Sequence, residues 1–123
     1  MFGKKKDRYD VNADVRETFL FLEREGFKVT KYQKNSELEY VYKLKGCVIE
    51  IFIDAFSSSS DVVVSNKNER SNIFYCKFFD EAKRTELMEK RNLGIAKGNL
   101  PMQLKLYGEF LKENTKCLIS DNF

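Results

Sequence analysis

The sequence predicts an α+β fold, in which an antiparallel sheet of about five strands packs against an N-terminal helix and two C-terminal helices. Residues 47–56 form the longest run of β-branched and aromatic residues, which favours a central strand. The preceding segment alternates in the same way and joins this run through a turn at Lys45 and Gly46. Apolar stripes at helical spacing come before and after the strands.

The turn at Lys45 and Gly46, with Gly46 supplying the positive φ, predicts the register of the two central strands. Folding about it pairs Leu44 with Cys47, Tyr42 with Ile49, Tyr40 with Ile51 and Leu38 with Ile53. All eight residues are apolar or aromatic, so they define a core face. The opposite, mixed face pairs Lys43 with Val48, Val41 with Glu50 and Glu39 with Phe52. A slip of one residue would destroy this agreement.

The N-terminal region is predicted to contain a tail and a helix. Residues 1–10 are expected to form a basic, flexible tail, and residues 11–123 a single domain. Asn12 is placed to cap a helix that runs to about Glu25, with Gly26 just past its end. Its inner stripe consists of Val15, Phe19 and Leu22. This helix is therefore expected to cover the apolar face of the sheet.

The other strands are predicted at residues 27–33, 62–65 and 73–79. Four serines and Asp61 at positions 57–61 favour a turn, because their side chains compete for backbone hydrogen bonds. Residues 66–72 are predicted to form a polar loop. In the fifth strand, Phe74, Cys76 and Phe78 are expected to face the core.

Two helices are predicted after the strands. Asp80 can cap the first, which runs to about Asn92 and is followed by a flexible link between Gly94 and Gly98. Pro101 marks the start of the second, which runs to about Glu113. Its stripe is Leu100, Leu104, Tyr107 and Leu111. The tail from residue 115 is expected to dock or to add a short edge strand.

Composition limits the class of protein. Hydrophobic residues make up 42% and charged residues 33% of the 123 residues, which is typical of a soluble globular domain. The net charge is +3, and the tail alone carries Lys4, Lys5, Lys6 and Arg8, so no basic stripe on the folded part is implied. The scattered cysteines and the lack of an apolar run of roughly 20 residues predict a cytoplasmic protein outside the membrane.

The sequence lacks most of the residue combinations on which catalytic sites depend. The chain has no histidine, which excludes the commonest general base and the Ser-His and Cys-His pairs. Glu50 and Asp54 share a face but lie roughly 13 Å apart on a strand, too far for a glycosidase pair. Aromatic neighbours indicate that Cys76 is a core thiol. We expect a non-catalytic protein without metal or cofactor; an enzyme that uses carboxylates and a divalent metal is a third alternative.

The mixed face of the sheet is the candidate binding surface. Its aromatic anchors are Phe52, Phe56 and Tyr75, and the charged residues around them are Glu39, Glu50, Asp54 and Lys77. Aromatic anchors provide buried area, and charges of both signs provide specificity and steering. The alternative that the C-terminal helices cover these residues stays open at this point.

The Lys- and Asn-rich chain begins Met1-Phe2-Gly3-Lys4 and ends in the helix from Leu104 to Glu113. In size and layout it resembles the small orphan immunity proteins that bacteria encode next to secreted toxins. This resemblance implies one cognate toxin, bound in the cytosol so that its active site or an adjacent surface is blocked. Immunity proteins that face basic nucleases are commonly acidic, whereas this chain is slightly basic.

The resemblance therefore requires a toxin of another kind or a patch of local acidity. Candidates for such a patch are Glu37, Glu39, Glu50 and Asp54. The alternative function is a small nucleic-acid-binding regulator or accessory protein that uses the basic tail and the open face of the sheet.

Overall fold

The computed structural model describes residues 9–66, 69–76 and 81–119, with side chains up to residue 114. Its helical elements are α1 (Val11–Thr18), α2 (Leu20–Arg24), the 3₁₀ helix η2 (Ile73–Tyr75), α3 (Glu81–Ala96) and α4 (Leu100–Ile119). Its strands are β1 (Lys28–Lys34), β2 (Glu37–Leu44), β3 (Cys47–Asp54), β4 (Ser59–Ser65) and β5 (Arg70–Asn72).

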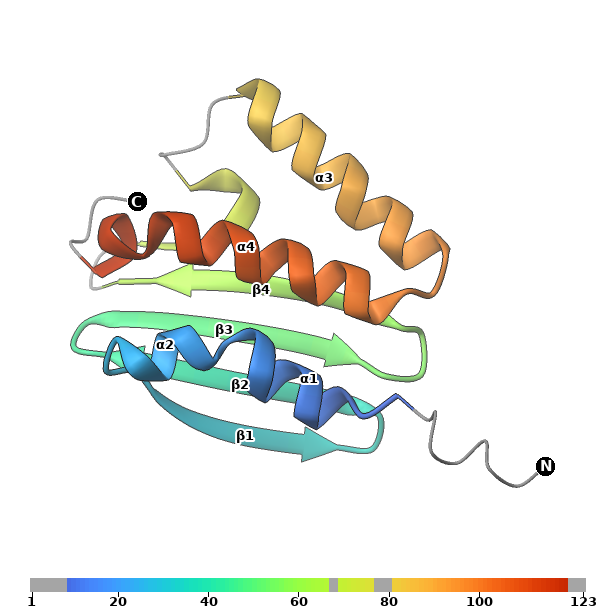
Figure 1. Cartoon of the computed structure of the whole chain (residues 1–123), viewed down its shortest axis with the longest axis horizontal. Coiled ribbons are helices and arrows are strands. Elements are labelled where there is room, and N and C mark those ends of the chain that lie inside the picture. Colours follow the sequence, from blue (N-terminus) through green and yellow to red (C-terminus); the bar gives the residue numbers. More distant parts are fainter. Residues whose placement is uncertain (1–8, 67–68, 77–80, 120–123) are drawn as a thin grey trace.

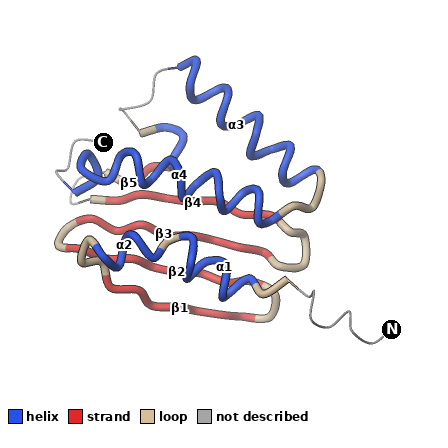
Figure 2. Tube along the Cα trace, viewed as in Figure 1, coloured by secondary structure: helices blue, strands red, loops and turns tan. Residues whose placement is uncertain are grey.

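The predicted α+β class is confirmed. The five strands form one antiparallel sheet in the order β1-β2-β3-β4-β5. Helices α1, α2 and α4 lie on one side of this sheet, and α3 lies beside α4 beyond β4 (Figure 1). The colouring by secondary structure in Figure 2 shows the same separation of helices from strands. The helical layer therefore covers one face of the sheet, and the second face is open except at its β4 side, where Arg91 of α3 reaches Asp61.

The register between β2 and β3 is the predicted one, from Leu44 opposite Cys47 to Leu38 opposite Ile53. Along β3, buried and partly exposed residues alternate strictly. The turn differs in one detail, because the positive φ recorded there is that of Lys45, at 53°, and not that of Gly46. The alternation of apolar and polar residues along β2 and β3 defined the core face correctly, although the positive φ of the turn belongs to a different residue.

The predicted N-terminal helix is interrupted. Phe19, with φ −106° and ψ 15°, separates α1 from α2 and remains fully buried. The cap is Asp10, whose Oδ1 accepts the N–H of Ala13 at 3.1 Å, while Asn12 instead accepts a hydrogen bond from the hydroxyl of Tyr40. Asp10 thus belongs to the folded part, although it was assigned to the tail.

The predicted fifth strand at 73–79 is wrong. The last strand is β5, inside the predicted polar loop, and Ile73–Tyr75 form η2. Asn72 causes this turn, because its Oδ1 accepts the N–H of Phe74 at 3.0 Å while its Nδ2 donates to Asp61 at 2.6 Å. The turn buries both Ile73 and Phe74, which a strand would send to opposite faces. Residues 77–79 lie outside the described residues.

Three further boundaries differ from prediction. Strand β4 begins at Ser59, within the predicted serine turn, because residues 59–61 pair with the end of β3. Helix α3 continues to Ala96, so Gly94 lies inside a helix where a Cβ would come within 2.9 Å of Gln103 Cγ. Helix α4 continues to Ile119 past a kink at Asn114, so residues 115–119 are helical and form no edge strand, while residues 120–123 lie outside the described residues.

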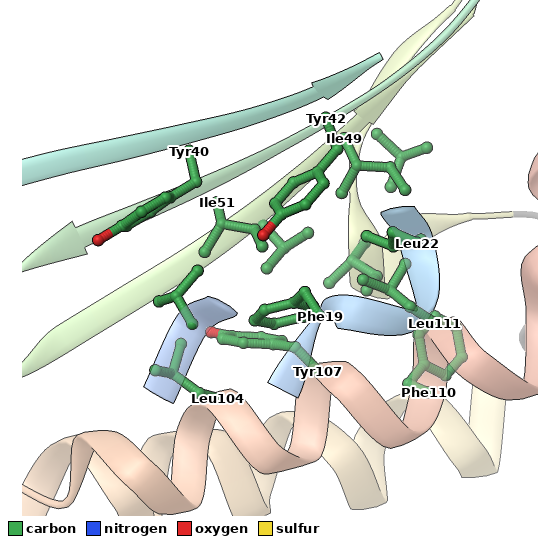
Figure 3. Close-up of a cluster of buried hydrophobic side chains, with 14 of the residues drawn as sticks. Phe19, Leu22, Tyr40, Tyr42, Ile49, Ile51, Leu104, Tyr107, Phe110 and Leu111 are labelled. Atoms are coloured by element: carbon green, nitrogen blue, oxygen red, sulfur yellow. The ribbon is translucent and has the colours of Figure 1, made fainter. Parts of the chain in front are cut away.

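One hydrophobic core lies between the sheet and the helices. Figure 3 shows Tyr42 and Ile49 of the sheet facing Phe19 and Leu111, with Tyr107 beside them. The rings of Phe19 and Tyr42 are 6.2 Å apart at their centres, a normal distance for an aromatic pair. The inner faces of β2 and β3 contribute to this core, as predicted, and Val62 and Val64 of β4 complete the sheet's part of it.

The two borders of the sheet differ. At β4, the Tyr107 hydroxyl donates to the carbonyl of Ser60 at 2.9 Å, and Gln103 Nε2 donates to the carbonyl of Ser58 at 2.8 Å. Helix α4 therefore satisfies one carbonyl group of β4 and one of the turn before it, at the end of the strand that β5 does not reach. At the other border, all seven residues of β1 are exposed.

Candidate partner-binding surface

The candidate surface is the face of the sheet opposite α1 and α4. Four of the predicted site residues lie on this face of β2 and β3 and are partly exposed. They are Glu39, Glu50, Phe52 and Asp54. No helix of the described residues lies over them, so the alternative that α3 and α4 cover this face does not hold for that part of the chain. Val41, Val48, Phe52 and Val63 form the apolar centre of this face.

A groove of about 600 Å³ crosses the end of this face where β2 begins and β3 ends. Its wall on the sheet includes Tyr32, Glu39 and Phe52, and α3 contributes Arg91 and Ile95. Tyr32 lies opposite Glu39 and Phe52 lies opposite Asp61, so four strands take part. A groove of this size can hold one or two side chains of a partner.

Acidic side chains dominate the lining. The carboxylates are those of Glu37, Glu39, Asp54 and Asp61, and the cationic side chains are those of Lys34 and Arg91. Arg91 is already paired with Asp61 at 3.4 Å, and its side chain is only 14% exposed. The remaining lining therefore favours a cationic group.

Asp54 has a structural task at the turn between β3 and β4. Its Oδ1 accepts the N–H of Phe56 at 3.0 Å and the hydroxyl of Ser36 at 3.2 Å. Desolvation acts to raise the pKa of Asp54, but these hydrogen bonds and those from Ser57 outweigh it and lower the pKa below its ordinary value. The Asp54 carboxylate thus holds the rim of the groove in place.

Glu39 and Glu50 lie on neighbouring strands of this face. Glu50 is paired with Arg70 at 3.2 Å. Desolvation by burial, the side-chain hydrogen bond with Glu50 and repulsion from its charge raise the pKa of Glu39 above its ordinary 4.5, against the attraction of Arg70. A cation brought by a partner would relieve this repulsion.

The three other predicted residues have different positions. Phe56 stands 89% exposed in the turn after β3, at the same end of the sheet as the groove. Tyr75 is 58% exposed but lies on η2 and not on the sheet, with the guanidinium carbon of Arg84 5.5 Å from its ring centre. Lys77 lies outside the described residues.

Tyr32 and Arg91 are among the groove residues that were not predicted from the sequence. Tyr32 could have been found, because the turn at Asn35 and Ser36 places it opposite Glu39 by the same counting that paired β2 with β3. Arg91 gave no signal in the sequence, since its position depends on how α3 packs against β4 and α4. Its guanidinium carbon lies 5.1 Å from the ring centre of Phe74.

Cys76 is buried, as predicted for a core thiol. Desolvation, with smaller contributions from Glu69 and Cys47 and an opposing one from Arg84, raises its pKa to about 12. The thiolate that a nucleophile requires is thus disfavoured.

Two searches over the described part of the chain gave no site. Residues 9–66, 69–76 and 81–119 contain no cluster of three or more potential metal-ligating Cys, Asp or Glu side chains. Within the same residues, no helix has both the length and the apolarity of a membrane span. Comparisons of the chain with protein families, with curated proteins and with solved structures found no match.

Proposed function

We propose that this chain is a non-catalytic binding protein that recognises another protein through the open face of its sheet. The groove between the sheet and α3 carries the proposal, because it combines the exposed aromatic ring of Tyr32, the ring of Phe52 and an excess of carboxylates. A partner loop that presents a Lys or Arg beside an apolar side chain fits this lining. Phe56, exposed in the turn at the same end of the sheet, adds an aromatic anchor.

The finer proposal is that the partner is a bacterial toxin and that this chain is its cytosolic immunity protein. Support comes from the resemblance in size and layout and from the local acidity that the resemblance requires. Three of the four carboxylates named for that purpose, Glu37, Glu39 and Asp54, line one groove, and Glu50 adjoins Glu39. A cationic surface of a toxin would complement this patch.

The alternative of a nucleic-acid-binding regulator is less well supported by the same lining, because carboxylates repel phosphate. The lack of histidine and the high pKa of the Cys76 thiol support the non-catalytic part of the proposal.

The test uses three forms of the protein as bait in nuclease-treated extracts of its native cells. They are the wild type, Phe56→Ala, and Tyr75→Ala as a matched control, since Tyr75 is an exposed aromatic residue away from the groove. We expect the wild type and Tyr75→Ala to retain one protein in stoichiometric amount at high salt. With the purified partner, Phe56→Ala should weaken binding about tenfold or more while its unfolding midpoint stays unchanged.

The toxin proposal has its own test. Expression of the captured partner alone should arrest growth, co-expression of the wild type should restore it, and Phe56→Ala should restore it less well. Equal binding by all three baits would disprove the proposed surface. Retention of nucleic acid that is lost on nuclease or salt treatment would instead favour the regulator.

A further inference from the structure

The free border of β1 is a second surface, which adjoins the groove and shares Tyr32 and Lys34 with it. Strand β1 pairs with β2 on one side only, and every one of its seven residues is exposed. Val29 and Tyr32 remain 39% and 56% exposed on its two faces. Alternate residues of such a border strand direct their backbone N–H and C=O groups outward, where another strand can bind them.

The opposite border shows that the fold can close an edge. Tyr107 of α4 binds the carbonyl group of Ser60 in β4, Gln103 binds that of Ser58 just before this strand, and β5 pairs with residues 63–65 of β4. Among the described residues, no side chain makes a comparable hydrogen bond to the backbone of β1. Strand addition, in which an extended peptide joins a sheet through main-chain hydrogen bonds, requires just such an open border.

Three lysines determine which strand can be added. Lys28, Lys31 and Lys34 are spaced three residues apart, and among the described residues none of them takes part in an ion pair. Lys28 and Lys34 lie on the open face, opposite Lys43 and Glu37, while Lys31 lies on the helical face, opposite Tyr40. The border is therefore positive on both faces.

This spacing is symmetric about Lys31, which argues against a second copy of the chain as the occupant. If two copies of β1 paired antiparallel over residues 28–34, Lys31 would face Lys31, and Lys28 would face Lys34 at both ends. Like charges directly opposite each other destabilise a pair of strands, whereas opposite charges stabilise it. A strand with carboxylates at three-residue spacing would meet all three lysines, in either direction.

We propose that the free border of β1 binds an extended acidic segment of a partner protein by strand addition, with Asp or Glu side chains opposite Lys28, Lys31 and Lys34. Main-chain hydrogen bonds hold the segment, and the lysines select its charge. The groove is not needed for this interaction.

The probe is an acetylated and amidated nonapeptide of three Thr-Glu-Val repeats, compared with one of three Thr-Lys-Val repeats. Nuclear magnetic resonance of the full chain measures binding and the exchange of backbone amide protons. We expect the acidic peptide to protect outward-facing amides of residues 28–34 from exchange and the basic peptide not to do so. An acidic peptide methylated on every backbone nitrogen of its repeats, which lacks N–H donors on both of its edges, should not bind.

A charge-reversed variant provides the matched control. Lys28→Glu with Lys31→Glu leaves Lys34, which faces Glu37, unchanged. This variant should bind the acidic peptide about tenfold more weakly and should prefer the basic one. Phe56→Ala should bind the acidic peptide like the wild type, which separates this proposal from that for the groove.

The proposal would be overturned by equal binding of both peptides, by protection outside β1, by unchanged binding of the methylated peptide, or by no binding at about 1 mM peptide. Self-association of the wild type with protection of residues 28–34 would equally overturn it, because the border would then be occupied by a second copy.

Discussion

The negative charge of Glu39 destabilises the folded protein, because Glu39 is partly buried and lies beside Glu50. Burial and the nearby Glu50 raise its pKa, so the folded protein binds a proton on Glu39 more tightly than the unfolded chain does. The contribution of this group to the free energy of unfolding is therefore stabilising at acidic pH. It is lost as the pH rises through the raised pKa.

Glu39→Gln is accordingly expected to stabilise the protein at about pH 7, by about 0.5 kcal/mol after screening by solvent. The advantage should shrink as the pH falls through the raised pKa and should be absent below 4.5, the ordinary pKa of this carboxyl group. Chemical denaturation of both proteins at a series of pH values measures the difference.

Glu89→Gln, on the exposed side of α3, controls for the loss of one negative charge. A Glu39→Gln variant that is equally or less stable than the wild type at neutral pH would contradict the described repulsion. If the variant is more stable but binds its partner less well, Glu39 is retained for binding at the expense of stability.

At the scale of elements, the contact between α1 and α4 depends on a glycine. A Cβ on Gly108 would lie 2.7 Å from Cγ2 and 3.5 Å from the carbonyl oxygen of Thr18. Thr18 itself is held in place, because its hydroxyl donates to Asp14 at 2.9 Å. The two helices can therefore approach only where α4 has no side chain.

Gly108→Ala should destabilise the protein by about 1–3 kcal/mol, although alanine favours an isolated helix by about 1 kcal/mol. Thr18→Ser removes Cγ2 and keeps the hydroxyl, so adding it to Gly108→Ala should restore most of the loss. Thermal unfolding of the two single variants and the double variant measures this coupling. Additive effects would show that the helices do not meet through these two residues.

The elements differ in how far the sequence predicts them. Strands β2 and β3 were predictable with their register, because two alternating patterns agree only in one alignment about the Lys45 turn. The last strand of the sheet was not predictable, because the alternation of apolar residues from Ile73 onward is typical of a strand. The Asn72 side chain, which binds Phe74 and Asp61 at once, produces η2 instead. That choice rests on a tertiary contact, which local patterns do not contain.

The same distinction applies to the candidate surface. Glu39 and Phe52 could be placed together because directly paired residues share a face. The groove itself required Arg91 and Ile95, which reach it from a helix distant in the sequence. Tyr75 was placed on the sheet only because a strand was expected there.

At the scale of the whole molecule, the sheet has an open border at β1 and a closed one at β4 and β5. This difference determines where copies of the chain could associate. An uncovered strand is a template for pairing with another copy, and lysines on such a strand oppose that pairing. Lys28, Lys31 and Lys34 would face one another in a full antiparallel pair of β1 strands. Their charges are therefore expected to oppose the joining of two copies of the chain at this border.

Replacing the three lysines by threonine should therefore promote self-association through β1. Threonine favours strands and carries no charge, so the variant keeps the outward backbone groups and loses the repulsion. Sedimentation velocity over a range of protein concentrations should show an increase in mean mass for the variant, larger than any increase for the wild type. The same measurement is made on a variant that carries Thr30→Pro in addition to the three threonine substitutions. Because proline lacks a backbone N–H donor and disfavours strand pairing, this variant separates pairing through β1 from a loss of solubility. If the triple variant sediments like the wild type, or if it associates equally with the proline present, the lysines do not prevent strand pairing at β1.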